Sequence, residues 1–355
     1  MLGFYRTYTT PFKEKIPSFE DGFFLRVSAF KRFLRFFSRY IYTEISLRNS
    51  KKIEKISPQH KRILWIQWVD AYLGDSLMDL SSRVLLADKR VDLLTKKYTA
   101  NIYKDDDVFD RIFTNSSQCN PDDYDLLIID SYRERSIRSF IGILSHIPHV
   151  SLYGYYNVDD FNRLYFSFYR INQLLLYPHN KQYIDDIARP LLPITSLDKS
   201  IVEGFGLTGS FITVVVGGAW KERTFHYWAD VIKGILSKNI VEKVVLVGAS
   251  DAKEESVSIC KQYPNNVVSF VGGCTFNQTA QVINKSIMLI CADGGLMHAA
   301  NAVKTPILGL FHELDPSVRF IKSNRSFGLT DKWCIDNISI KEIVRKAEIL
   351  SLFDD

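Results

Sequence analysis

The segment CADGGLMHAANA, residues 291–302, is the strongest candidate for binding chemistry in this sequence. It follows an apolar run of strand length and places one acid, two glycines and the start of a helical pattern in succession. Amide N–H groups and the positive end of a helix dipole attract anions at such a turn, and Gly294 and Gly295 let phosphate oxygens approach the backbone closely. The pattern predicts a diphosphate site that His298 can reach, unless Asp293 is only the N-cap of the helix.

A second glycine-rich segment, GGAWKERTFHYW at residues 217–228, also follows an apolar run of strand length. Gly217 and Gly218 permit close backbone approach to a ligand. Lys221 and Arg223 can offset the charge of a phosphate group. The alternative interpretation is an ordinary surface loop whose cations are solvated.

The segment LGDSL, residues 73–77, follows the first apolar strand of the N-terminal half. A carboxylate at this position, Asp75, can act as a general base that removes a proton from an attacking hydroxyl group. Asp75 can equally be the N-cap of the helix that follows, and the segment alone does not decide between the two.

The hydrophobic pattern after residue 58 predicts alternating strands and helices. A first series of strands is expected at 62–69, 91–95, 111–114 and 126–130, with a helical stretch from the turn at 73–75 to about residue 88. A second series is expected at 212–216, 243–247, 267–271, 287–291 and 306–310, separated by helices at about 225–238, 251–262, 276–284 and 295–303. Short apolar strands that alternate with helices indicate parallel sheets covered on both faces.

The predicted fold class is therefore α/β, with two Rossmann-like, doubly wound parallel-sheet domains that face each other across a cleft. The expected divisions are a basic aromatic extension at 1–58, an N-terminal domain at 59–188, a linker at 189–210 and a C-terminal domain at 211–355. Ligands of open α/β sheets bind beyond the carboxyl ends of the strands, so the cleft is the predicted site.

The net charge of +5 is distributed unevenly along the chain. Residues 1–62 contain 14 Lys and Arg against five Asp and Glu, so this segment carries a net +9 and the rest of the chain −4. A basic arm on a mildly acidic body indicates an anionic partner for the arm and argues against a body that binds nucleic acid.

Within this arm, residues 23–42 predict an amphipathic helix with an apolar stripe of Phe23, Val27, Phe30, Leu34, Phe37 and Ile41. The cations Lys31, Arg32, Arg35 and Arg39 fall on a different face. Such a helix can lie in the interface of an anionic membrane, or it can pack its stripe on the protein and leave the arginines in water.

Composition excludes several other classes of protein. Hydrophobic residues make up 46% of the chain, which is enough for full cores. The five cysteines form no CxxC pair and no His, Cys, Asp or Glu set has ligand spacing, so neither a disulfide framework nor a metal site is expected. The acidic run at 105–107 is expected to be solvated. No membrane-spanning run and no secretory signal are predicted.

Three segments, at residues 73–77, 217–228 and 291–302, carry a resemblance to a known family. In their order and spacing along the chain they resemble the ADP-heptose:lipopolysaccharide heptosyltransferases, the family-9 glycosyltransferases of GT-B fold. The resemblance covers about residues 62–350 and is strongest over 210–318, where VVLVGASDAKEE, FVGGCTFNQTAQVI and ICADGGLMHAANAVKTPILGLF are similar to family blocks.

The resemblance implies a role for each candidate residue. Asp75 would be the catalytic base. Donor binding would fall to Gly217, Gly218, Lys221, Arg223, Gly248, Thr275, Asp293, Gly294, Gly295 and His298. Arg223 stands where the family usually has the phosphate-binding lysine, with Lys221 as a substitute. Gly294 replaces a usual Ser or Thr, and His312-Glu313 replaces a Gly-Pro, so the donor can differ from ADP-heptose.

The implied function is inverting, metal-independent transfer of heptose or a related sugar from a nucleotide-diphosphate donor, with no cofactor. The acceptor would be a lipopolysaccharide or lipooligosaccharide core, and the enzyme would be cytoplasmic and peripheral to the inner membrane of a Gram-negative-type cell. The alternatives are a transferase that uses another sugar nucleotide for capsule or outer-core glycan, a GT-B epimerase, and a non-catalytic protein that binds sugar nucleotides or lipid-linked glycans.

Overall fold

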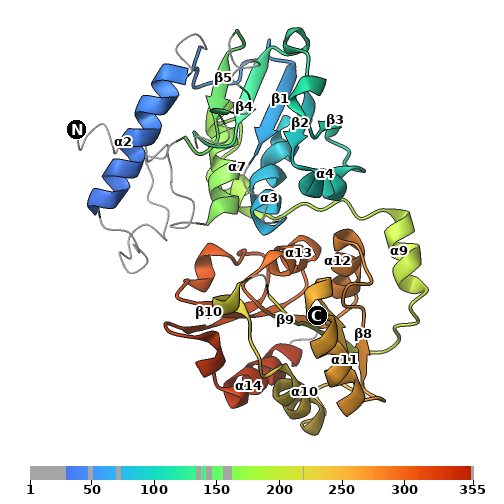
Figure 1. Cartoon of the computed structure of the whole chain (residues 1–355). Coiled ribbons are helices and arrows are strands. Elements are labelled where there is room, and N and C mark those ends of the chain that lie inside the picture. The colour runs from blue at the N-terminus through green and yellow to red at the C-terminus, as the bar shows by residue number, and fades with distance from the viewer. Residues whose placement is uncertain are drawn as a thin grey trace. The chain divides into compact units, whose positions relative to one another are not determined.

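The computed structural model divides the chain into two compact units, Met1–Leu191 and Leu192–Asp355 (Figure 1). It describes residues 29–46, 51–68, 73–132, 137–138, 140, 146–154, 162–218 and 220–352. No helix within these residues is both long enough and apolar enough to cross a lipid bilayer.

In the described part of unit 1, five parallel strands form one sheet in the order β3-β2-β1-β4-β5. The strands are β1 (Arg62–Gln67), β2 (Arg90–Thr95), β3 (Phe109–Phe113), β4 (Leu126–Ile129) and β5 (His149–Ser151). The central strands are apolar on both faces, and all four residues of β4 are buried. Chain order reverses between β1 and β4, so the crossovers on the two sides of this point leave in opposite directions.

The helices of unit 1 surround this sheet. They are α2 (Ala29–Ser46), α3 (Leu73–Leu80), α4 (Lys97–Tyr103), α7 (Arg163–Leu174) and α8 (Lys181–Ile187), with short 3₁₀ segments at Ser81–Leu86, Ser116–Gln118 and Pro121–Asp123. Helix α7 packs against α3 and the 3₁₀ segment that follows it. Almost all of α7 is buried, including Arg163 and Arg170.

The predicted N-terminal extension is partly integrated into unit 1. Tyr40 and Tyr42 of α2 pack on the core beneath β1 and β4. Residues 51–53 run beside β5: the N–H of Ile53 donates to the carbonyl of His149 at 2.9 Å, and the N–H of His149 donates to the carbonyl of Lys51 at 2.9 Å. Ile56 is buried. The end of the extension therefore belongs to the fold of unit 1.

In unit 2, the described residues form a six-stranded parallel sheet in the order β11-β10-β9-β6-β7-β8. Its strands are β6 (Phe211–Val215), β7 (Lys243–Val247), β8 (Val267–Ser269), β9 (Met288–Ala292), β10 (Ile307–His312) and β11 (Ser326–Asp331). Chain order reverses between β6 and β9, as it does between β1 and β4 in unit 1.

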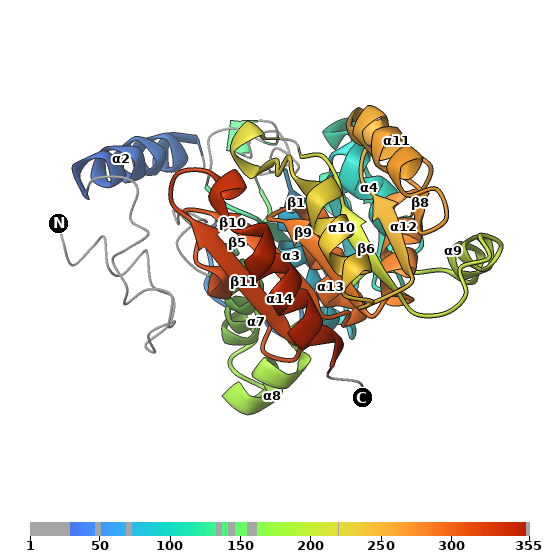
Figure 2. The same cartoon turned by 90° about the horizontal axis from the view of Figure 1, so that it is seen from below.

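Alternate residues of these strands build two separate cores. On one face, Ile212, Val214, Val244 and Leu246 pack with residues of α10 (Trp228–Ser237), α11 (Lys253–Gln262) and α14 (Ile340–Ser351). On the other face, strand residues pack with α9 (Ser196–Glu203), α12 (Phe276–Asn284) and α13 (Gly295–Val303). Helices α10 and α14 lie side by side in both views (Figures 1 and 2). The sheet is thus covered on both faces, as its apolar strands predict.

Three features differ from the sequence-based expectations. The pattern did not predict β5 or β11; β5 has three residues, and the residues of β11 are only partly buried or exposed, so neither gives a strong apolar run. The predicted linker at 189–210 contains α9, which packs on α12. The acidic run at 105–107 is not all solvated, because the carboxylate of Asp106 forms a buried ion pair with Arg83.

The buried imidazole of His149 makes the stability of unit 1 depend on pH. Burial, with a contribution from Lys52, lowers the pKa of His149 to about 4. Between pH 6.5 and 4 the unfolded chain therefore binds a proton that the folded chain does not, and the free energy of unfolding should decrease by up to about 3 kcal/mol as the pH falls through this range. His149→Gln should reduce this pH dependence in urea titrations at pH 7 and pH 4.5. Equal slopes for the wild type and the variant would contradict the assignment.

Candidate active site

Asp75 lies next to the point where the strand order of unit 1 reverses. It is in the first turn of α3, just beyond β1, which pairs with both β2 and β4. The turn predicted at 73–75 is thus already helical. The side chain of Asp75 is 27% exposed, so solvent or a substrate can reach the carboxylate.

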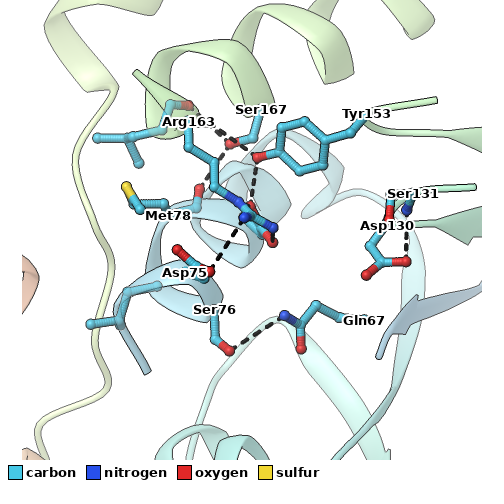
Figure 3. A network of polar contacts seen from close by, with 12 residues as sticks. Gln67, Asp75, Ser76, Met78, Asp130, Ser131, Tyr153, Arg163 and Ser167 are labelled. Atoms are coloured by element: carbon cyan, nitrogen blue, oxygen red, sulfur yellow. Dashed lines mark hydrogen bonds and ion pairs between the residues drawn. The ribbon is translucent and has the colours of Figure 1, made fainter. Parts of the chain in front are cut away.

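The carboxylate of Asp75 faces the guanidinium group of Arg163, the first residue of α7 (Figure 3). Nη1 of Arg163 lies 3.4 Å from Oδ2 of Asp75. Nε and Nη2 of the same arginine donate to the two carboxylate oxygens of Asp79, one helical turn after Asp75. The hydroxyl group of Tyr153 donates to Oδ1 of Asp79 at 2.5 Å.

These contacts keep a buried positive charge in place beside Asp75. Burial by itself disfavours the charge of Arg163, but the carboxylates of Asp79 and Asp75 outweigh it and hold the pKa of Arg163 well above its ordinary value. Arg163 is therefore charged at any physiological pH. The arrangement brings together one accessible acid, one buried acid and one buried cation.

A second polar group lies at the same edge of the sheet. Asp130 directly follows β4, is fully buried, and accepts a hydrogen bond from the N–H of Ser131 at 2.6 Å. At the end of β1, the side chain of Gln67 contacts Ser76 of α3 at 3.4 Å (Figure 3). Asp130 was not among the predicted site residues, although an acid that ends an apolar strand is a signal for it.

In unit 2 the two glycine-rich segments follow β6 and β9, the paired strands between which the order of this sheet reverses. Gly217 and Gly218 come after β6, and Asp293 and Gly294 come after β9. Two segments that are distant in the sequence are thus placed at the same edge of one sheet, where ligands of such sheets bind.

Asp293 is buried and binds two arginines. Nε of Arg319 lies 3.2 Å from its Oδ1, and Nη1 of Arg223 lies 3.0 Å from its Oδ2. Burial would raise the pKa of Asp293, but Arg319, Arg223 and the buried His298 lower it below its ordinary value. The interpretation of Asp293 as an N-cap is wrong, because the N-cap of α13 is Gly294 and no side chain caps this helix.

Gly294 is exposed, and the fold does not require a glycine at this position. Its backbone is extended (φ −175°), and a Cβ atom would meet nothing nearer than the carbonyl oxygen of Ala292 at 3.8 Å. The first turn of α13 is thus an uncapped helix N-terminus with open space before it. Asp293, the residue before Gly294, forms an ion pair with Arg223 beside this turn. Such a turn can accept an anion on its amide groups.

Residues 212–344 match the family model described as glycosyltransferase family 9 (heptosyltransferase). The matched segment lies within the C-terminal unit and makes up just over a third of the chain. A search of curated protein sequences found no match to the chain.

Solved structures show that the likeness in fold extends to both units. A family-9 glycosyl transferase from Veillonella parvula DSM 2008 aligns with a TM-score of 0.71 at 15% identity, over 84% of this chain and 100% of that chain. The ADP-heptose LPS heptosyltransferase II of E. coli gives 0.59 at 14% (82% and 98% coverage), and the E. coli heptosyltransferase WaaC with ADP gives 0.60 at 14% (82% and 100%). These matches confirm the predicted fold class, two parallel α/β units of the GT-B kind.

The remaining predicted donor residues have other contacts. The N–H of Gly217 donates to the carboxylate of Glu255, a residue that the sequence analysis did not consider. Gly248 has a positive φ of 156° and packs against the carbonyl of Val216. Thr275 caps α12, with its hydroxyl group accepting from the N–H of Gln278 at 3.2 Å.

Lys221 is exposed in a short 3₁₀ segment and forms no ion pair with the described residues, whereas Arg223 is held by Asp293. Arg319 was missed by the sequence analysis because it lies 26 residues after Asp293 and no local pattern links the two. Of the two candidate cations, Arg223 is the one that the fold attaches to the turn before α13.

Two glycine substitutions should separate the demands of the fold from those of a ligand. Gly217 has φ 80°, and a Cβ atom there would lie 2.5 Å from Cβ of Ala252. Gly217→Ala should therefore lower the free energy of unfolding by about 2 kcal/mol or more. Gly294→Ala should change it by less than about 0.5 kcal/mol. Urea denaturation of both variants measures this, and equal destabilisation by the two would refute the claim that the fold leaves the space at Gly294 open.

Proposed function

We propose that this glycosyltransferase transfers heptose, or a related sugar, from ADP-heptose to the core oligosaccharide of a lipopolysaccharide, with inversion and without a metal ion. The observation that carries the proposal is the pair of sites at the two strand-order reversals: an accessible acid in unit 1, and an uncapped helix N-terminus with two arginines in the family-9 domain. Relatives that share this fold include a heptosyltransferase solved with ADP.

On the donor side, the diphosphate binds at the amide groups of Gly294 and Gly295, where the dipole of α13 favours negative charge. Arg223, placed by its ion pair with Asp293, neutralises the charge that grows on the leaving nucleoside diphosphate. Exposed Lys221 is available to assist. Asp293 acts indirectly: it is buried, and its carboxylate fixes Arg223 and Arg319.

On the acceptor side, Asp75 removes the proton from the acceptor hydroxyl as its oxygen attacks the anomeric carbon. The attack comes from the face opposite the leaving group, so the configuration inverts. General-base assistance of this kind contributes about 10²–10⁴ in rate. The acid and the diphosphate site lie on different units, so transfer needs both.

A transferase for a different sugar nucleotide is the second candidate. His312 ends β10, which pairs with β9 beside the proposed donor turn, and the next residue, Glu313, has a positive φ of 51°. These two residues stand where the heptosyltransferase family usually has Gly-Pro. The nucleotide base and the sugar of the donor can therefore differ from those of ADP-heptose. Assays with a panel of donors distinguish the two candidate functions.

An Asp75→Asn variant tests the role of the acid. It should lose at least 100-fold in turnover while retaining nucleotide affinity, because the lost group is not part of the donor site. The measurement is release of nucleoside diphosphate from a panel of ADP-, UDP- and GDP-sugars with a heptose-deficient lipooligosaccharide, together with thermal stabilisation by each nucleotide.

The comparison variant in that experiment is Gly294→Ala, which should show the opposite pattern: a folded protein with weakened nucleotide binding. If Asp75→Asn turns over at the wild-type rate, Asp75 is not the base, and the binding-protein or epimerase interpretations gain support. If a UDP- or GDP-sugar is the preferred donor, the ADP-heptose assignment fails while glycosyl transfer stands.

The proposed location is the cytoplasmic face of the inner membrane, with α2 in contact with anionic lipid. Leu34, Phe37 and Ile41 of the predicted stripe are 48%, 47% and 41% exposed, and Ile45 continues the stripe at 68%. Phe23 and Val27 lie outside the described residues, as do the side chains of Phe30 and of the four cations. Among the described side chains of α2, Tyr40 and Tyr42 pack on the core. An exposed apolar stripe in a basic arm is typical of an interfacial helix.

Replacing the stripe tests membrane contact better than removing residues 1–57, since residues 51–56 carry backbone hydrogen bonds of the fold. A variant with serine at 34, 37, 41 and 45 should bind vesicles of phosphatidylcholine with 30% phosphatidylglycerol at least about 10-fold more weakly, because burial of each side chain contributes about 1.5–3 kcal/mol. The matched control has serine at four other exposed apolar positions, Tyr98, Leu197, Val257 and Leu352, and should bind like wild type. Unchanged binding by the stripe variant would remove the argument for membrane contact.

A further inference from the structure

Arg163 is held between two acids of one helix. Asp75 and Asp79 are four residues apart on α3, so their side chains lie on one face, an arrangement that like charges disfavour. The guanidinium group of Arg163 lies between them: two of its nitrogens contact Asp79, and the third is 3.4 Å from Asp75. Among the described residues, Arg163 is the one group that forms an ion pair with Asp75.

The position of this guanidinium group is fixed by further contacts. The ring of Tyr153 lies 4.8 Å from the guanidinium carbon, and its hydroxyl oxygen, which donates to Asp79, is also 3.1 Å from the carbonyl oxygen of Arg163. Ser167 of α7 donates to the carbonyl of Met78 in α3 at 2.9 Å, which joins the two helices (Figure 3). Arg163 and Asp79 are almost completely buried, so neither can leave this arrangement without exposing an unpaired charge.

We propose that Arg163 is a positioning residue for the reaction: it orients the carboxylate of Asp75 toward the acceptor hydroxyl. This inference rests on the proposed role of Asp75 as the base. Arg163 contacts Oδ2 of Asp75, which leaves Oδ1 to accept the proton.

Asp79 makes this orientation compatible with general-base chemistry. A guanidinium group that faced Asp75 alone would stabilise its negative charge and weaken its tendency to accept a proton. The charge of Arg163 is largely offset by the two contacts with Asp79, which Tyr153 supports. The guanidinium group of Arg163 thus orients the carboxylate of Asp75 while adding little net positive charge beside it. Lysine, a point charge, cannot contact both acids in this way.

The test compares turnover of Arg163→Gln in the wild-type background and in the Asp75→Asn background. Heptosyl transfer from ADP-heptose to heptose-deficient lipooligosaccharide is measured and corrected for the folded fraction by circular dichroism. In the wild-type background kcat should fall about 10- to 100-fold with an unchanged KM for the donor. In the Asp75→Asn background the same change should lower kcat by less than twofold, because Arg163 acts through Asp75.

Two further variants give readouts that a merely structural role would not produce. Arg163→Lys keeps the charge and should recover part of the kcat lost in Arg163→Gln. Arg83→Gln breaks a comparable buried ion pair, with Asp106, that does not include Asp75. It should reduce thermal stability to a similar extent but leave kcat per folded molecule within twofold of wild type.

If Arg163→Gln does not fold, the double variant Asp79→Asn with Arg163→Gln removes both buried charges together. It tests the positioning role of Arg163 in the same way, and the same loss of kcat is expected. Wild-type kcat in the folded Arg163 variants, or full additivity with Asp75→Asn, would overturn the positioning role. Undiminished turnover of Asp75→Asn alone would instead overturn the base assignment on which it rests, so the two failures are distinguishable.

Discussion

A charge removed from water must be paired with an opposite charge, and both candidate sites are built on this requirement. In unit 1 the buried Arg163 joins the buried Asp79 and the accessible Asp75, so the ionised group of three carries a net −1. In unit 2 the signs are reversed: the buried Asp293 joins Arg319 and the more accessible Arg223, with a net +1. One cluster is suited to receive a proton and the other to receive an anion.

The strand order explains why these clusters lie where they do. In each sheet the order reverses between two neighbouring strands, β1 and β4 or β6 and β9, and successive crossovers leave on opposite faces. The carboxyl ends of those strands therefore lie beside a gap between the crossovers, next to Asp75 in the first turn of α3, Asp130, Gly217 and Gly294. The fold provides the opening, and the charged side chains decide what can bind there.

The central strands of both sheets and helices α12 and α13 could be predicted from the sequence, because a continuous apolar run between glycine-containing turns is a local signal. Strands β5 and β11 could not, since edge strands are short or half exposed. Asp75, Asp293 and the two glycine pairs could be found from local motifs. Arg163 and Arg319 could not: their partners are 84 and 26 residues away, and only the folded chain brings them together.

Residues 51–53 protect the edge of the sheet at β5. Among the described strands of unit 1, β5 lies at the edge of the sheet, and a bare edge offers unsatisfied amide and carbonyl groups to any other polypeptide. Residues 51–53 occupy those groups at His149, so the arm that carries the basic helix also closes the sheet against unwanted pairing. A chain without this segment would leave the N–H and carbonyl groups of His149 unpaired at this edge, whether or not α2 contacts lipid.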